Sequence, residues 1–215
     1  SEFAHPQLQN AGVFFNNQTV DCIILPIAMS IFVARIIGNE KEGMTFKLQG
    51  SNGTSIKRIF YQKLAFTMGI FFVLLSIKTI GTVVFSILQN IQLPLSTILI
   101  HLSGEMLNVF ILACFTITLS MILKKQGLLM AFGFLGGFFG VVLSSKSSYL
   151  LSFLIPWIGS AYLAPYKFHL IDGTTYCYEL DPQIFLRIIL YFVFCVICYI
   201  FCKGVISNKE GVLYD

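Results

Sequence analysis

The 215-residue sequence predicts an all-α protein that crosses a membrane several times. Hydrophobic residues make up 56% of the chain and charged residues 11%, which is less than half the charged share of an average soluble domain. The mean hydropathy is +0.82. A soluble enzyme of this length could not hide so much apolar surface from water. Because one crossing takes roughly 20 apolar residues, the chain has room for about five or six crossings.

Five apolar stretches, separated by polar or proline-containing segments, predict five transmembrane helices. We expect residues 1–19 to form an outer loop before the first helix and residues 203–215 to form a cytoplasmic tail after the last. The five predicted helices span residues 20–37, 64–88, 97–123, 126–143 and 183–202.

Basic residues orient the predicted helices. The polar segment 38–63 holds Lys41, Lys47, Lys57, Arg58 and Lys63. Since cytoplasmic loops are enriched in Lys and Arg, this segment is predicted to lie in the cytoplasm. The pair at positions 124 and 125, two crossings later, falls on the same side.

Residues 149–164 are apolar but short for a crossing. They number only 16, contain Pro156 and Gly159, and end before Pro165. Basic residues on the inner side are equally many whether this segment dips into the membrane or crosses it. Its length and its two helix breakers favour a re-entrant segment, followed by an outer loop at 165–182. Such a broken helix is tolerated only where protein or a wet cavity satisfies its backbone.

The cytoplasmic segment carries the signals of a short surface helix. Asn39 is a predicted N-cap with Glu42 three residues later, and Glu40 also faces the positive helix start. Lys47 falls in the predicted last turn, and Gly50 is placed to end the helix.

A second helix is predicted directly after it. Ile56, Ile59, Phe60 and Leu64 share one helical face, whereas Lys57 and Arg58 lie elsewhere. The segment is either a solvated loop or a docking element for a cytoplasmic partner. Two adjoining helices favour docking, because a simple connector would not need them.

Residues 34–48 read Ala-Arg-Ile-Ile-Gly-Asn-Glu-Lys-Glu-Gly-Met-Thr-Phe-Lys-Leu. This run resembles the pattern in permease subunits of ABC-2-type transporters, and most closely the permeases of lantibiotic and bacitracin self-immunity transporters. The family's Gly-Thr pair reads Gly43-Met44-Thr45 here. The resemblance implies a six-helix, type V exporter-like fold with a re-entrant hairpin before the last helix and one further helix upstream of residue 1. It also implies that the loop docks on an ATP-binding subunit through Asn39, Glu40, Glu42, Gly43, Lys47, Lys57 and Arg58.

The same resemblance implies a function. The chain would be one permease of an ABC exporter in the bacterial cell membrane, paired with a second permease as a homo- or heterodimer. It would expel a lantibiotic-type antimicrobial peptide and so confer self-immunity or resistance. We expect no catalysis by this chain: the sequence has no Gly-x-x-x-x-Gly-Lys-[Ser/Thr], so ATP and magnesium would be held by the partner subunit. The net charge of +4 is too scattered for nucleic acid.

Other functions stay open on the residues alone. The exported molecule could instead be a drug, a lipid-linked molecule or an ion. From different classes, the chain could be a non-transporting membrane scaffold or an intramembrane enzyme that uses His101 and Glu105.

Polar residues interrupt two of the predicted helices. Lys78 and Glu105 lie about ten and eight residues from the outer ends of their helices, which places both roughly 12–15 Å deep. Opposite charges at one depth predict an ion pair, because an isolated charge in a membrane is costly. His101, Glu105 and Asn108 share one helix face. This set is interpreted as a structural bridge or part of a substrate path, with proton relay or catalysis as the less favoured alternatives.

Four glycines lie close together in the fourth predicted helix. They form two overlapping Gly-x-x-x-Gly pairs, which let another helix approach closely. The partner helix would belong to this chain or to a second permease. No metal site is predicted, because His5 and His169 are isolated and most cysteines lie in apolar runs. The glycines are Gly133, Gly136, Gly137 and Gly140.

Overall fold

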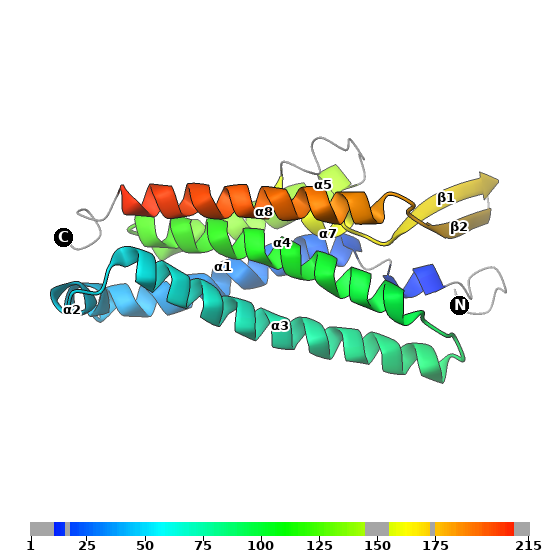
Figure 1. Cartoon of the computed structure of the whole chain (residues 1–215), viewed down its shortest axis with the longest axis horizontal. Coiled ribbons are helices and arrows are strands. Elements are labelled where there is room, and N and C mark those ends of the chain that lie inside the picture. Colours follow the sequence, from blue (N-terminus) through cyan, green and yellow to red (C-terminus); the bar gives the residue numbers. More distant parts are fainter. Residues whose placement is uncertain (1–10, 16–17, 145–154, 173–174, 209–215) are drawn as a thin grey trace.

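The computed structural model describes residues 11–15, 18–144, 155–172 and 175–208, and five long helices dominate it (Figure 1). Each of the five is long and apolar enough to cross a membrane, which confirms a polytopic, mainly helical membrane protein. The long helices are α1 (Gln18–Glu42), α3 (Ile56–Leu88), α4 (Leu95–Ile122), α5 (Gln126–Ser144) and α8 (Ile184–Ser207).

The shorter elements lie at the two ends of the bundle and inside it. α2 (Thr45–Ser51) lies at one end, which we call the α2 end, and the β-hairpin lies at the opposite, hairpin end (Figure 1). The others are η3 (Ala11–Phe15), η4 (Pro156–Ile158), α7 (Gly159–Tyr162), β1 (Tyr166–Asp172) and β2 (Thr175–Leu180).

The hairpin corrects the expectation of a wholly helical chain with loops at 1–19 and 165–182. Strands β1 and β2 pair antiparallel, with Phe168 opposite Tyr178 and Tyr166 opposite Leu180. In β1, aromatic and polar residues alternate with the two-residue period of a strand. The segment was predicted to be a loop because it is polar overall. In the N-terminal segment, η3 lies against the hairpin, where Gly12 leaves no room for a side chain beside Tyr178.

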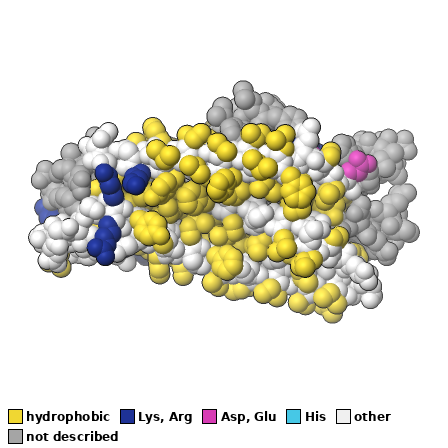
Figure 2. Space-filling view, viewed as in Figure 1, with side chains coloured by type: hydrophobic (Ala, Val, Ile, Leu, Met, Phe, Trp, Pro, Cys, Tyr) yellow, Lys and Arg dark blue, Asp and Glu magenta, His cyan; other side chains and the backbone are white. Residues whose placement is uncertain are grey.

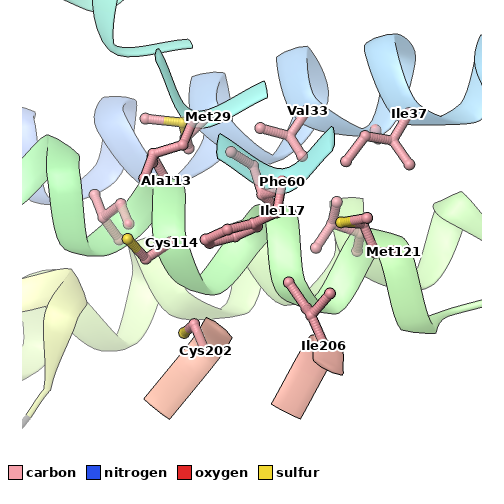
Figure 3. Packing of buried hydrophobic residues seen from close by; sticks show 14 of the residues in the cluster. Met29, Val33, Ile37, Phe60, Ala113, Cys114, Ile117, Met121, Cys202 and Ile206 are labelled. Carbon is pink, nitrogen blue, oxygen red and sulfur yellow. The ribbon is translucent and has the colours of Figure 1, made fainter. Parts of the chain in front are cut away.

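Helix α4 is the most buried of the five long helices and α3 the least. α4 lies between α1 and α8, and its apolar side chains contact both (Figure 3). Large hydrophobic side chains remain exposed along α3, α5 and α8, and they cover much of the visible face in Figure 2. These faces suit contact with lipid, because no water-soluble bundle would leave them open. The labelled core residues in Figure 3 are Met29, Val33, Ile37, Phe60, Ala113, Cys114, Ile117, Met121, Cys202 and Ile206.

The α5 glycines pack inside the chain. A Cβ at Gly133 would collide with Ser30 and lie 2.9 Å from the carbonyl oxygen of Pro26 on α1. Gly137 approaches the carbonyl of Ile23 on α1 in the same way. Gly136 and Gly140 instead leave room for Trp157, and Gly140 also lies against α1. Glycine therefore allows α1 and α5 to approach at backbone distance.

The loop at the α2 end differs from the sequence prediction in where its helices begin and end. α1 continues to Glu42, so Asn39 is inside a helix and caps nothing. The break falls at Met44, whose φ of 53° is left-handed. Gly50 lies within α2 and does not end it. The last turn of α1 contacts α3 and α4, as described below. These contacts favour continuation of the helix past Asn39, where the sequence predicted a new helix to begin.

The predicted amphipathic helix after this loop is the first part of α3, which runs unbroken from Ile56 to Leu88. Ile56, Ile59, Phe60 and Leu64 are buried, as the pattern indicated. Of the predicted re-entrant segment, residues 149–154 lie outside the described part of the chain. The described remainder forms the short helical turns η4 and α7, which contact α1, α4 and α5.

Candidate functional site

Four polar side chains meet between α1, α3 and α4. The Lys78 ammonium donates to Oδ2 of Asp21 at 2.6 Å and to Oε1 of Glu105 at 2.5 Å. Nε2 of His101 lies 3.2 Å from the same Glu105 oxygen. We call Asp21, Lys78, His101 and Glu105 the charge cluster. It joins three helices through ion pairs inside an otherwise apolar bundle.

Helix geometry places the two central members at one level. Lys78 is ten residues before the end of α3, and Glu105 is ten residues after the start of α4. Since the two helices run antiparallel through a short connection, both side chains lie roughly 15 Å from the hairpin end of these helices. The predicted Lys78–Glu105 pair therefore forms.

Asp21 is the member that the sequence analysis missed. It lies in the first turn of α1 and is 8% exposed. Its signal was present: an acidic residue inside an apolar stretch requires a cationic partner, and Lys78 was already identified as buried in the membrane. Lys78 and Glu105 come from α3 and α4, whereas α1 supplies the second carboxylate.

An aromatic cap covers the charge cluster toward the hairpin end. The Phe15 ring meets the His101 ring edge-on at 4.9 Å and stacks on Tyr166 at 5.8 Å. Phe15 itself is 2% exposed. A cavity of about 10 Å³, enough for one water molecule, lies beneath it and is lined in part by Lys78, His101 and Thr79. A space for one small polar group thus adjoins the cluster at Lys78 and His101.

Asn108 does not belong to the charge cluster, although it shares a helix face with Glu105. In the amide orientation that satisfies every partner, its oxygen accepts from Ser160 Oγ at 2.7 Å. Its nitrogen donates to the Pro156 carbonyl at 2.8 Å and to Tyr191 Oη at 3.2 Å. Gly159 packs against this group so closely that any side chain there would collide with Asn108 and Tyr191. These contacts fasten η4 and α7 to α4 and α8.

An apolar cavity of about 200 Å³ lies between α1, α4, α5 and η4. Pro26, Phe115, Phe132 and Trp157 are among its walls. A space of this size holds an apolar group larger than a benzene ring. It is separate from the charge cluster, with which it shares no lining residue.

At the α2 end, the last turn of α1 holds two other helices. The Lys41 ammonium donates to the backbone carbonyls of Ser120, Met121 and Leu123 at 2.7, 2.8 and 2.8 Å, where α4 ends. The neighbouring Glu40 forms an ion pair with Lys63 of α3. Lys41 therefore caps the C-terminus of α4, where carbonyl groups have no intrahelical donors.

We expect Lys41→Met to loosen the end of α4. The replacement keeps the apolar stem but leaves three carbonyls without their shared donor, at a cost of about 1–3 kcal/mol for the local structure. Hydrogen exchange should report this at the Leu123 amide, which donates to Leu119 in the last turn of α4. Its exchange should accelerate at least tenfold. Lys124→Met, at an exposed position nearby, serves as the control and should leave this amide unchanged.

Most of the predicted coupling residues face outward at the α2 end. Glu40 differs, because its ion pair with Lys63 turns it into the bundle. Two apolar side chains that the sequence analysis did not single out are also exposed there: Met44 at 66% and Leu48 at 63%. We call Met44, Lys47, Leu48, Lys57 and Arg58 the α2 surface. The exposed predicted residues are Asn39, Glu42, Gly43, Lys47, Lys57 and Arg58.

Comparison of the chain with protein-family profiles, with characterised proteins and with solved structures finds no match. Within the described ranges, no group of three or more His, Cys, Asp or Glu side chains could hold a metal ion. In the charge cluster, the Lys78 ammonium takes the place between the carboxylates that a metal would need.

Proposed function

We propose that this chain is a membrane-spanning permease subunit of an ATP-driven ABC exporter that expels a lantibiotic-type antimicrobial peptide from the membrane. It would work with a second permease and with ATP-binding subunits that hold ATP and magnesium. The observation that carries the proposal is the α2 surface: a short helix with exposed apolar side chains in the segment where the resemblance expects an ATP-binding subunit to dock.

The composition of the α2 surface supports a protein partner. Phe46 is buried and holds α2 against the bundle, whereas Met44 and Leu48 are exposed. Exposed apolar side chains in the same segment as the exposed Lys47, Lys57 and Arg58 suit a contact that combines apolar and charged groups.

The distribution of charge supports a cytoplasmic location for the α2 end. Exposed basic side chains gather there, as Figure 2 shows at one end of the molecule. By the positive-inside rule this end faces the cytoplasm, where ATP is available. The exposed basic residues near this end include Lys47, Lys57, Arg58, Lys124, Lys125 and Lys203.

The contacts of Glu40 and Lys41 supply a route for coupling. α2 follows α1 after only two residues, and the last turn of α1 holds α3 through Lys63 and α4 through its final carbonyls. A displacement of α2 by a closing ATPase dimer would therefore act on two membrane helices at once. α3 and α4 also carry three members of the charge cluster at the opposite end.

We expect the double replacement Met44→Asp with Leu48→Asp to reduce co-purification of the ATP-binding subunit at least tenfold. Two carboxylates would remove the apolar centre of the docking surface, and Asp tolerates the left-handed backbone at position 44. The measurement is co-purification from cells that express the ATP-binding protein and second permease encoded beside this chain. Leu95→Asp, equally exposed at the hairpin end, is the matched control.

Undiminished co-purification of the double variant would contradict the docking assignment, and a gene neighbourhood without an ATP-binding protein would contradict the exporter. The substrate class has its own test. Deletion of the gene should raise sensitivity to lantibiotics or bacitracin-like peptides, and unchanged sensitivity would leave the exporter without its proposed substrate.

A further inference from the structure

The charge cluster has more negative than positive charge. Asp21 and Glu105 supply two carboxylates, whereas Lys78 supplies one ammonium. Counted over these three side chains, one negative charge is in excess. The carboxylate side chains are only 11% and 3% exposed, so water compensates this charge poorly. A buried uncompensated charge costs several kcal/mol, which favours binding of one further cation.

One hydrogen-bond acceptor of the cluster is unused. Oε1 of Glu105 accepts from Lys78, but Oε2 of the same carboxylate is buried and has no hydrogen-bond partner among the described residues. A buried carboxylate oxygen without a donor is unfavourable, and an N–H group with a positive charge is its strongest partner. The unused oxygen therefore points to a ligand with such a group.

The residues around the cluster indicate how large the cationic group is and what kind of molecule bears it. The lining of the water-sized cavity includes Lys78 and His101, which both contact Oε1 of Glu105, but neither carboxylate. An ammonium group has nearly the size of the water molecule that this cavity would hold. Ile77 and Ile80, close to Lys78 along α3, are each 62% exposed on one face of this helix. A cation on an apolar chain could lie along this face and reach a depth of roughly 15 Å, as snorkelling side chains do.

We propose that the charge cluster binds one cationic group of the exported molecule, an ammonium carried on an apolar chain. Glu105 and Asp21 are its acceptors, and Lys78 is the resident cation that shares them. The identification of this ligand as the exported molecule rests on the proposed function, whereas binding itself does not.

The test is titration calorimetry of the full chain in phosphatidylcholine nanodiscs, whose lipid ammonium has no N–H to donate. The probe is dodecylammonium, and 1-dodecanol is its neutral counterpart. We expect saturable binding of one dodecylammonium per chain above the background of empty discs, and none for dodecanol. Glu105→Gln, which leaves Lys78 paired with Asp21, should weaken binding at least tenfold. Glu42→Gln, the same change at the α2 end, should leave it unchanged.

A second variant tests the role of Lys78 without adding unpaired charge. Lys78→Met combined with Asp21→Asn removes the resident cation, retains Glu105 and keeps the formal charge of the cluster. It should bind dodecylammonium at least tenfold more tightly than the natural chain. Equal affinity would show that Lys78 does not share the site.

Two results would overturn the proposal as a whole: absence of saturable binding, or equal binding by the natural chain and Glu105→Gln. Displacement of the probe by millimolar ammonium chloride would overturn the requirement for an apolar chain. None of these measurements needs an ATPase. Failure here leaves the exporter proposal in place, and failure of the co-purification test leaves the binding site in place.

Discussion

Lys78→Met should lower the free energy of unfolding by about 3–5 kcal/mol, the usual cost of breaking a buried ion pair from one side. The replacement leaves the carboxylates of Asp21 and Glu105 near one another with no ammonium between them. Their repulsion adds to the cost of burying each charge. Thermal unfolding in detergent, followed by circular dichroism, measures the effect.

Variants of the other cluster residues distinguish loss of the shared ammonium from loss of a single ion pair. Asp21→Asn or Glu105→Gln leaves Lys78 with one carboxylate, so each should cost less than half as much as Lys78→Met. Adding Asp21→Asn to Lys78→Met should recover part of the loss, because only one charge then remains unpaired. Lys57→Met, at an exposed position on α3, is the control. If Lys78→Met were no worse than Glu105→Gln, the cluster would not be held together by the lysine.

Gly133→Leu should separate α1 from α5 and destabilise the protein by about 1–3 kcal/mol or more, as overpacking of a tight contact does. The Cβ alone would collide with Ser30 and press on the Pro26 carbonyl, and backbone atoms cannot yield as a flexible side chain can. Thermal unfolding again measures the loss. Exposure of Cys22, which is buried near Gly140 on this contact, to a maleimide reagent gives a second measurement.

Gly81→Leu is the matched control for this prediction. Gly81 also lies inside a membrane-spanning helix, but a Cβ there would have nothing within 4 Å. Since Leu is a better helix former than Gly by roughly 0.8 kcal/mol, this variant should be neutral or slightly more stable. Equal destabilisation by the two replacements would mean that glycine serves helix flexibility and not the α1–α5 contact.

The predicted helices agree with the observed ones best where apolar length alone decides. The fourth, predicted at 126–143, is observed at Gln126–Ser144, and the third, predicted at 97–123, at Leu95–Ile122. Agreement is poorest at the α2 end. There Asn39 and Gly50 predicted helix ends that the structure does not have. The contacts of Glu40 and Lys41 with other helices stabilise the last turn of α1 more than a single cap would stabilise a break.

In the candidate site, too, some residues could be predicted from their type and place in a helix, whereas others depend on tertiary contacts. Lys78, His101 and Glu105 were predictable, since a polar residue in an apolar helix is conspicuous and needs a partner. Asn108 shares the helix face of Glu105, but its partners come from η4, α7 and α8, because one long helix face contacts different neighbours along its length. Lys41 was counted only as a cytoplasmic charge, because no sequence pattern reveals that a side chain will cap a different helix.

By itself, the sequence determined that this is a membrane protein with five long apolar helices, because the free energy of placing a segment in lipid depends on residue type and length. Only the tertiary structure decided which charges meet. Asp21 and Lys78 are 57 residues apart, on α1 and α3. Their pairing depends on how α1, α3 and α4 are arranged around one another, and that arrangement follows from packing among all the helices, including the glycine contact of α1 with α5.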